Sequence, residues 1–373
     1  MIKVGILSMQ RIINYGSFLQ AYGLKCILEE MGCCVEFVDY HPGECLIKDK
    51  VSQSGFLRKI SKAVEVLKVG APLKHGLAFI KYKKTFSKNY FKFLGISDKK
   101  NYFPVVDLLI IGSDEVFNCV QNNVNVGFSP ELFGEGNNAK RLISYAASFG
   151  NTTLTKLEQF GKKEQLKDLL NSFQCISVRD ENSYMIVSAL TNKTIYRHID
   201  PVLAYDYLCK CDKIPEIKDS GYIILYGYTG RFTKDECREI KRYAKLKNLK
   251  IYCIGGVQHV CEKYIDCSPF EVISYFNNAE AVITDTFHGI ILSIITHKHF
   301  VVFIRDRGYG NSEKLTDLIN IFSLSDCVIT DLKQLRKKIE TEICYETIDD
   351  ILTHERDKTY KYLSSNINRC KDN

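Results

Sequence analysis

The run Val-Ile-Thr-Asp-Thr-Phe-His-Gly at residues 282–289 contains the side chains that are best suited to chemistry. An apolar strand enters a polar turn, and His288 then stands at the start of an apolar helix predicted for residues 290–296. Free N–H groups at a helix N-terminus favour anions, and ligands bind at strand ends in α/β sheets. The structural alternative is that Asp285 or Thr286 only caps this helix and His288 is a hydrogen-bonded turn residue.

Arg179 is a second candidate, because it directly follows a short apolar strand at residues 175–178. The five fixed donors of a guanidinium at the end of a buried strand need anionic or carbonyl partners. Those partners are either Asp180 or Glu181, in a structural ion pair, or the carboxylate or phosphate of a ligand.

Polar residues also precede the first predicted helix. Asn14 or Ser17 can cap this helix, Tyr15 lies beside the cap, Gly16 permits close backbone approach, and Gln20 follows one turn later. This composition is typical of a ligand loop, and equally of a well-capped turn between a strand and a helix.

A similar turn ends the apolar strand at residues 106–111. Gly112, Ser113 and Asp114 are the glycine and small polar residues that ligand loops use, although ordinary turns use them as well. Here Asp114 and Glu115 are suited to position the hydroxyl groups of a sugar.

The elements that must position these side chains alternate between strand and helix along the chain. We expect strands at residues 2–7, 35–39, 106–111, 141–147, 175–178, 196–199, 222–226, 251–254, 281–284 and 300–304. We expect helices at residues 17–31, 154–170, 234–247, 269–278, 290–296 and 313–322. Such alternation predicts parallel βαβ units with right-handed crossovers.

The chain of 373 residues exceeds one ordinary core, so two domains are expected. We predict an α/β fold of two doubly wound domains, residues 1–205 and 206–345, facing each other across a cleft. The lysine-rich tail at residues 346–373 is expected to return to the first domain as a helix. Strand ends of both domains would then converge on the cleft.

Composition limits the class of protein. The chain is 45% hydrophobic and 25% charged, as in soluble globular proteins, and no run approaches the ~20 apolar residues that span a bilayer. Its N-terminus lacks the pattern of a signal peptide. The 15 cysteines are scattered, with no CxxC pair, which indicates reduced thiols rather than a metal site. We therefore expect a cytoplasmic protein without a bound metal.

Residues 48–100 form a basic insertion in the first domain, with fourteen Lys and Arg residues against three acidic ones. Two amphipathic helices are predicted there, at residues 55–70 and 77–94. Their lysines are either a solvated face or a surface for anionic lipid, which would allow peripheral membrane contact. No recognisable nucleic-acid-binding motif is present. No P-loop or G-x-G-x-x-G follows the first strand, which argues against kinase-like and dehydrogenase functions.

Taken together, these motifs resemble the polysaccharide pyruvyl transferase family, whose motifs match in order at residues 14–20, 111–118, 144–150, 177–180, 200–201 and 284–289. The resemblance implies a GT-B-like fold of two Rossmann-like domains. It also implies transfer of pyruvate from phosphoenolpyruvate to a sugar diol as a ketal, with phosphoenolpyruvate as co-substrate and no other cofactor.

The resemblance assigns roles to individual residues. His288 would be the acid acting on the donor, and Arg179 and Thr286 would stand in the donor site. Beside these, we expect Phe287 and Gly289 of the same turn to contact the donor, and either Asp285 or Asp114 to act as a base. The turns at the strand ends of the first domain would hold the acceptor, among Asn14, Tyr15, Gly16, Gln20, Gly112, Ser113, Ser148 and Gly150.

Two positions depart from the family. Thr286 stands where some relatives carry an arginine, so Lys298, Arg305 or Arg307 would have to supply the missing cation. Where relatives carry an Asn-Ser-Arg run, this chain has Asn-Ser-Glu-Lys, so the resemblance gives Lys314 no firm role.

The leading hypothesis is thus a pyruvyl transferase of bacterial capsular or other surface-polysaccharide synthesis. A lipid-linked glycan acceptor would bring this enzyme to the inner face of the membrane. One alternative is a GT-B glycosyltransferase that uses a nucleotide sugar. Another is a non-catalytic polysaccharide-assembly protein that binds membranes through its basic insertion.

Overall fold

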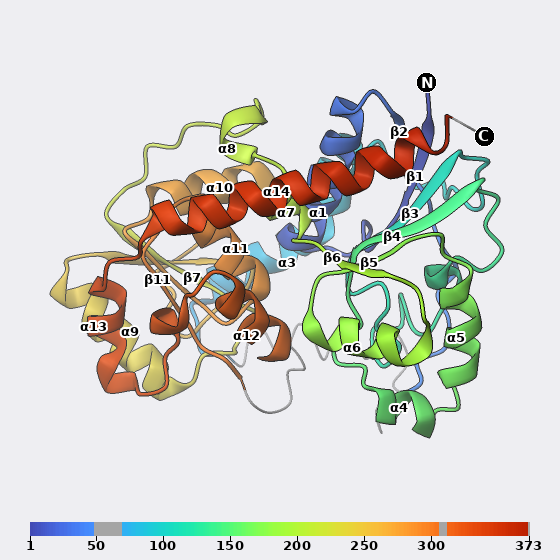
Figure 1. Ribbon diagram of the computed structural model, residues 1–373. Helices are drawn as coiled ribbons and strands as arrows, with labels where there is room; N and C mark the ends of the chain where they lie inside the picture. The colour runs from blue at the N-terminus through green and yellow to red at the C-terminus, as the bar shows by residue number, and fades with distance from the viewer. Residues whose placement is uncertain (48–68, 306–311, 372–373) are drawn as a thin grey trace.

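The computed structural model describes residues 1–47, 69–305 and 312–371. Two lobes are each built on a parallel β-sheet, and helix α14 (Tyr345–Asn368) crosses both of them (Figure 1). This two-sheet α/β architecture confirms the expected fold class.

The first sheet has six parallel strands in the order β2-β1-β3-β4-β5-β6. They are β1 (Lys3–Leu7), β2 (Cys34–Phe37), β3 (Leu108–Asp114), β4 (Arg141–Ala147), β5 (Ile176–Val178) and β6 (Ile195–Arg197). The strand order reverses direction between β1 and β3, and ligands bind beyond the carboxyl ends of strands at such a switch point. The loops that begin at Ser8 and Glu115 therefore leave the sheet side by side.

The second sheet has five parallel strands in the order β11-β10-β7-β8-β9. They are β7 (Tyr222–Tyr226), β8 (Lys250–Ile254), β9 (Lys263–Tyr264), β10 (Ala281–Thr284) and β11 (Phe300–Val302). Its switch point lies between β7 and β10. Every residue of β7 and β10 is buried, as expected for apolar strands covered on both faces.

Helices cover the faces of both sheets. Those connected with the first sheet are α1 (Tyr15–Glu30), α3 (Leu73–Leu94), α4 (Leu154–Gln159), α5 (Lys163–Asn171) and α6 (Glu181–Leu190). The link to the second lobe carries α7 (Pro201–Ala204) and α8 (Tyr207–Lys210). The second sheet is flanked by α9 (Lys234–Leu246), α10 (Pro269–Asn278), α11 (Phe287–Ile295), α12 (Ser312–Ile321) and α13 (Leu335–Glu340).

Several boundaries differ from the sequence-based expectations. The single helix predicted for residues 154–170 is two helices, because Gly161 adopts a left-handed conformation (φ +61°) between them. Helix α6 was not predicted. Helix α11 begins at Phe287 rather than at residue 290, since Thr286 already provides the cap. His288 therefore lies inside the first helical turn, not before it.

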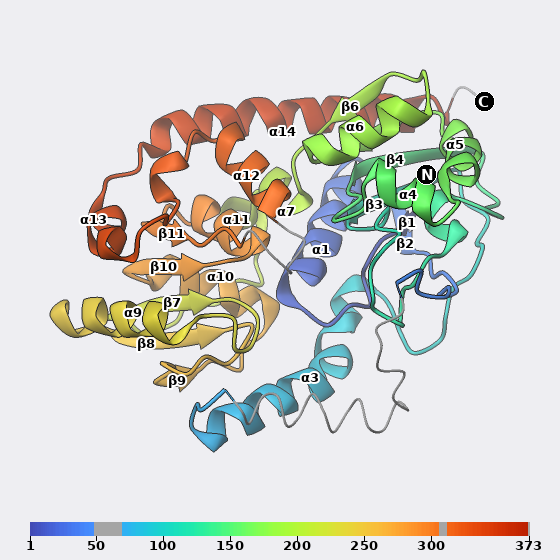
Figure 2. The ribbon, with the colours of Figure 1, turned by 90° about the horizontal axis from the view of Figure 1, so that it is seen from below.

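Aromatic side chains join the two lobes. The ring of Phe270 on α10 lies 5.0 Å from that of Tyr22 and 5.8 Å from that of Phe18, both on α1. Helix α3 contacts α1 and β9, with Phe79 edge-on to Tyr264 at 5.9 Å (Figure 2). Helix α3 corresponds to the second predicted helix of the basic insertion. The first, at residues 55–70, falls largely outside the described residues, so the insertion as a whole stays a prediction.

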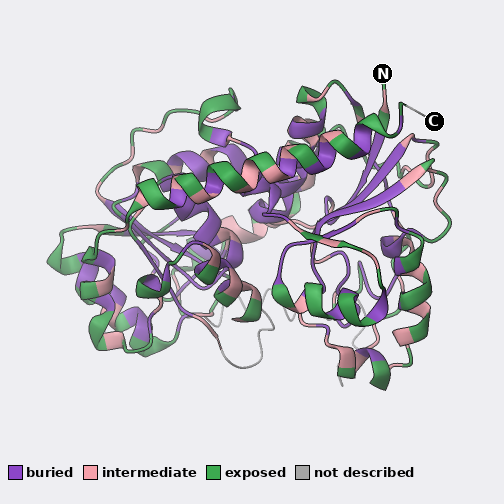
Figure 3. Ribbon diagram, in the orientation of Figure 1, coloured by how far each residue is buried: buried purple, intermediate pink, exposed green. Residues whose placement is uncertain are grey.

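Helix α14 contacts the first sheet. Tyr362 Oη donates to the carbonyl oxygen of Ser144 on β4 at 2.8 Å, and Arg141 Nη2 donates to Asn366 Oδ1, also at 2.8 Å. The central strands β3, β4, β7 and β10 are almost entirely buried, whereas the edge strands β2 and β6, helix α14 and the outer helices are partly exposed (Figure 3). Among the described residues, no helix has the length and apolar character required to span a membrane.

Candidate functional site

The two switch points face each other, and the side chains that follow them meet. A Cβ atom added to Gly16, which follows β1, would lie 2.2 Å from Nδ1 of His288, which follows β10. The imidazole ring thus rests on the backbone of α1. Glycine is required here by close approach, and the contact joins two predicted site residues from different lobes.

Arg179, at the end of β5, is the central cation of this site. Its Nη1 donates to Asp200 Oδ2 at 2.7 Å and its Nη2 to Asp114 Oδ1 at 3.3 Å. Its guanidinium carbon lies 4.6 Å from the centre of the Phe287 ring. The side chain is only 2% exposed, and Nε has no hydrogen-bond partner among the described residues. One buried donor of Arg179 is therefore left for a ligand.

The expected structural partners of Arg179 have other roles. Asp180 caps α6 by accepting from the backbone N–H of Ser183 at 2.8 Å, and it accepts from Ser148 Oγ at 2.5 Å. Glu181 pairs with Arg197 at 2.6 Å. The alternative of a local ion pair is therefore wrong, and the carboxylates that hold Arg179 come from β3 and from the start of α7.

His288 is the candidate acid. Its Nε2 lies 3.8 Å from Asp200 Oδ2, without a hydrogen-bond partner among the described residues, and its side chain is 15% exposed. Burial lowers the pKa of His288 more than the neighbouring carboxylates of Asp200 and Asp114 raise it. The ring is thus neutral near pH 7, and an anion bound beside it would raise its pKa again.

Lys314 on α12 is a second cation in the site. Its Nζ binds Glu115, which follows β3, and lies 5.9 Å from the centre of the Phe287 ring. Burial lowers the pKa of Lys314, but the Glu115 carboxylate raises it more, and the result is a raised pKa. Lys314 is therefore charged. The sequence assigned it no firm role, because the spacing after β11 differs from that of relatives.

Lys298, Arg305 and Arg307 were proposed from the sequence to supply the cation missing at Thr286, and Lys314 was not among them. Arg305 is held by Glu236, with Nη1 at 2.5 Å from Oε1, and by Asp285 at 3.4 Å. Lys298 follows the opposite end of α11, and Arg307 lies outside the described residues. Lys314 is therefore the cation that the structure places over Phe287 together with Arg179.

Two aspartates support the site. Burial raises the pKa of Asp114, but Arg179, His288 and a hydrogen bond from Ser17 Oγ (2.7 Å) outweigh it, so its pKa lies below the ordinary value. Asp200 is fully buried and caps α7 by accepting from the backbone N–H of Val202 at 2.9 Å. Asp200 belongs to a quoted family motif, yet it was not selected from the sequence as a site residue.

Asp285, in contrast, is part of a separate buried network. Its Oδ2 lies 3.5 Å from Arg231 and 3.4 Å from Arg305. Burial raises the pKa of Asp285 despite both arginines. This network stiffens the turn between β10 and α11, and it draws the Asp285 carboxylate toward Arg231 and Arg305.

Other predicted residues shape the turns. Thr286 Oγ1 accepts from the backbone N–H of Gly289 at 3.0 Å and so caps α11, while a Cβ atom on Gly289 would lie 2.0 Å from Thr284 Oγ1. Asn14 Oδ1 caps α1 by accepting from the backbone N–H of Ser17 at 2.7 Å. The capping alternative is thus correct for Thr286 and Asn14, and it coexists with the His288 site.

The remaining predicted acceptor residues are mostly internal. Tyr15 Oη donates to Cys267 O at 3.1 Å, Gln20 Nε2 to Ser8 Oγ at 2.9 Å, and Ser113 Oγ to Ala146 O at 3.1 Å. Gly112 packs on the carbonyl of Tyr145, and Gly150 lies against Glu115 and Asn118. These residues form the walls behind the site.

Tyr228, which follows β7, was missed by the sequence reasoning. It is 54% exposed, and the guanidinium carbon of Arg231 lies 4.7 Å from its ring centre. Tyr228 also lies within electrostatic range of Lys314 and Glu115. A polar aromatic residue two positions after a strand that borders a switch point is the signal that would have found it.

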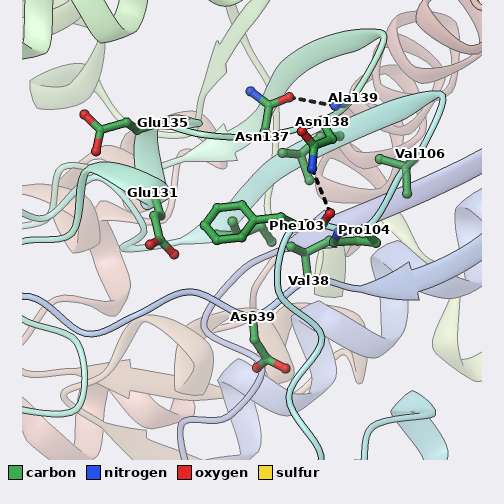
Figure 4. Close-up of a pocket in the computed structure, with 12 residues that line it drawn as sticks. Val38, Asp39, Phe103, Pro104, Val106, Glu131, Glu135, Asn137, Asn138 and Ala139 are labelled. Carbon is green, nitrogen blue, oxygen red and sulfur yellow. Dashed lines mark hydrogen bonds between the residues drawn. The ribbon is translucent and has the colours of Figure 1, made fainter.

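A small pocket lies elsewhere, on the first lobe near Val38, Phe103 and Asn138 (Figure 4). Its volume of about 10 Å³ holds at most a single water molecule. The described residues that line it include none of the predicted site residues. No group of three or more His, Cys, Asp or Glu side chains among the described residues is arranged to hold a metal ion.

Comparisons with solved structures give distant similarities. The chain is similar to a UDP-GlcNAc 2-epimerase from Neisseria meningitidis bound to UDP-GlcNAc, with 10% identity over 99% of this chain and 100% of that one and a TM-score of 0.47. A UDP-GlcNAc 2-epimerase from Methanocaldococcus jannaschii gives 10% identity over 95% and 100%, with a TM-score of 0.46. A mutant O-GlcNAc transferase from Thermobaculum terrenum gives 9% identity over 99% of this chain and 66% of that one, with a TM-score of 0.45.

Sequence comparison is more informative. No curated protein matches the chain significantly. The family model described as polysaccharide pyruvyl transferase matches residues 14–307, which include Asp114, Arg179, Asp200 and His288 but end before Lys314. The match spans most of the 373 residues, and the chain therefore belongs to the polysaccharide pyruvyl transferase family.

Proposed function

We propose that this protein transfers pyruvate from phosphoenolpyruvate to two hydroxyl groups of a sugar, forming a cyclic ketal during the synthesis of a bacterial surface polysaccharide. One observation carries the proposal. Arg179 and Lys314, from different lobes, both lie over the Phe287 ring at the start of α11, with His288 next to that ring. Two cations and a helix N-terminus suit a compact polyanion that carries a carboxylate and a phosphate.

Donor binding would use the positive charges of Arg179 and Lys314, which are paired with carboxylates of the protein when no donor is bound. Asp114 and Asp200 both pair with Arg179, and Glu115 pairs with Lys314. The unpartnered Nε of Arg179 is available to an anionic oxygen, and Lys314 can turn from Glu115 toward the ligand. The N–H groups at the start of α11 add a favourable dipole.

The chemistry then follows from the state of His288. The bound donor would raise the pKa of its ring, so the imidazolium forms where it is needed. It would protonate the methylene carbon of phosphoenolpyruvate, which becomes a methyl group and leaves a cationic C2. A sugar hydroxyl attacks C2 and loses its proton to a base. A second hydroxyl then displaces inorganic phosphate to close the ketal, and its proton leaves with the phosphate.

Asp114 is the better of the two candidate bases. Its carboxylate is ionised at neutral pH and shares Arg179 with the donor site, whereas Asp285 is bound to Arg231 and Arg305. The glycan acceptor would approach along the first turn of α1, which carries Ser17, and the loop after β3, which carries Glu115. A lipid-linked acceptor would place a cytoplasmic enzyme at the inner face of the membrane.

The test is phosphate release from phosphoenolpyruvate in the presence of galactosides, glucosides and N-acetylhexosaminides. We expect acceptor-dependent release that His288→Gln reduces about 10²–10⁴-fold. His297→Gln serves as the matched control, because His297 is a half-exposed histidine paired with Asp349. In parallel, thermal shifts with phosphoenolpyruvate are compared with those of UDP-, GDP- and CMP-sugars. Stabilisation by a nucleotide sugar alone would favour a glycosyltransferase instead.

A further inference from the structure

A second groove lies on the first lobe, between the edge strand β6 and helix α14. Its volume is about 700 Å³. The residues that line it include Glu181, Tyr184, Tyr196, Arg197 and Tyr362. None of the residues that form the donor site lines this groove, so the proposed transfer of pyruvate leaves it unexplained.

Aromatic rings form one wall of the groove. Tyr184 and Tyr196 are among the more exposed large side chains of the chain, at 36% and 42%. The Tyr196 ring lies 5.2 Å from that of Tyr362, and the Tyr362 ring lies 4.5 Å from that of His198 in a tilted arrangement. Exposed rings supported from behind lose little entropy on binding, and they offer both an apolar face and a polar hydroxyl. Such a surface fits the C–H face and the hydroxyl groups of a sugar ring.

The groove is also cationic. Arg197, Lys358, Lys361 and Arg369 line it, against the single carboxylate of Glu181. Along α14, Lys358 pairs with Glu355 and Lys361 with Asp357, and the two lysine side chains are 42% and 75% exposed. Ion pairs whose lysine is this exposed are weak, so the ammonium groups remain available to a carboxylate of a ligand.

The inner wall of the groove is connected to the donor site. Arg197 donates to Glu181 at 2.6 Å and to Asp317 at 2.7 Å. Glu181 lies two residues after Arg179, and Asp317 lies one helical turn after Lys314 on α12. A ligand that displaces Glu181 or Asp317 from Arg197 would therefore act on the segments that carry both donor-site cations.

We propose that this groove binds a carboxylate-bearing stretch of the acceptor glycan, distant from the sugar that reacts. The inference rests on the proposed function, because pyruvate ketals themselves add one carboxylate to each modified sugar. The product chain is thus more anionic than the acceptor. A cationic groove with aromatic walls would hold a chain that has already been modified and favour repeated transfer along it.

Direct binding is measured first, without phosphoenolpyruvate, by calorimetry with acidic octasaccharides of alternating uronate and N-acetylhexosamine and with neutral glucan octasaccharides. We expect the wild type to bind the acidic chain more tightly, and Tyr196→Ala with Lys361→Glu to weaken this binding at least tenfold. Lys241→Glu, on an exposed position of α9, makes the same change of charge away from the groove. It should leave binding unchanged.

Measurements of turnover distinguish the proposed transfer of pyruvate from the proposed binding of glycan in the groove. The groove variants should raise the KM for an octasaccharide acceptor at least fivefold and leave the KM and kcat for a monosaccharide acceptor unaltered. Phosphate release that is absent with every acceptor, together with intact binding of acidic octasaccharides, would remove the proposed function but not the groove. No binding of acidic chains, equal binding by the groove variants, or equally strong groove-dependent binding of phosphatidylglycerol vesicles would overturn the assignment.

Discussion

Arg179 at the end of β5 donates to Asp200 at the start of α7 across 2.7 Å, and both side chains are almost fully buried. The same Asp200 oxygen lies 3.8 Å from Nε2 of His288. Asp200 therefore joins Arg179, the candidate donor-binding cation of the first lobe, to the candidate acid of the second.

Replacing Asp200 by asparagine should keep the cap of α7 and remove the charge. Because Arg179 then loses a buried ionic partner, we expect a loss of about 2 kcal/mol in the free energy of unfolding and a fall in kcat/KM of at least tenfold. Urea unfolding and phosphate release measure the two effects. Asp206→Asn is the control, since Asp206 also caps a short helix but pairs with Arg356 at a partly exposed site. It should cost under about 1 kcal/mol.

Lys314→Met tests the second cation. Methionine keeps most of the side-chain volume and removes the charge, so we expect the KM for phosphoenolpyruvate to rise about tenfold or more, the equivalent of ~1.4 kcal/mol. The variant also leaves Glu115 without its ammonium partner, and the pKa of Glu115 should rise. Adding Glu115→Gln should restore stability but not donor affinity. Recovery of both by the double variant would contradict a direct role of Lys314.

The pH dependence should separate the free protein from its donor complex. Burial lowers the pKa of His288 in the free protein, and the acid must be protonated to act, so kcat/KM should fall as pH rises through that lowered pKa. Bound phosphoenolpyruvate raises the pKa, so the corresponding fall in kcat should occur about one pH unit higher or more. If kcat and kcat/KM fell at the same pH, the donor would not contact His288.

Gly16→Ala tests the contact between the lobes. Alanine in a helix ordinarily stabilises by about 1 kcal/mol relative to glycine. Here the added Cβ would lie 2.2 Å from His288 Nδ1, so we expect a destabilisation of about 1–3 kcal/mol instead and strong loss of activity. Combining it with His288→Ala should return the stability to that of His288→Ala or above. Thermal and urea unfolding of the three variants decide the point.

His198 should make stability dependent on pH. Burial first, and then Lys358, lower the pKa of His198 from 6.5 to about 4. A group whose pKa is lowered by folding contributes its stability above the unfolded pKa and loses it as pH falls. We therefore expect about 3 kcal/mol to be lost between pH 6.5 and pH 4. Urea unfolding of His198→Gln should show a flatter dependence over this range than the wild type.

Much of the fold could be predicted, because strands buried on both faces read as uninterrupted apolar runs. The structure reproduces β4, β7 and α10 at their predicted residues. Helix boundaries were less accurate where one residue decides them, as Gly161 does between α4 and α5. Helix α6 was missed because its apolar residues follow the capping carboxylate of Asp180 without a strong helical period.

The order of residues along the chain is enough to show which side chains stand at strand ends, and it singled out His288, Arg179 and Asp114. Strand ends in a parallel sheet share one edge. The partners of these side chains, in contrast, depend on the three-dimensional arrangement of the two lobes. His288 and Phe287 are contacted by residues from segments more than 25 residues away or from another lobe, namely Asp200, Lys314 and Gly16. Pairing over such distances depends on how the two sheets are placed. For the same reason, Asp285 stands beside His288 in sequence but binds the arginines of a different network.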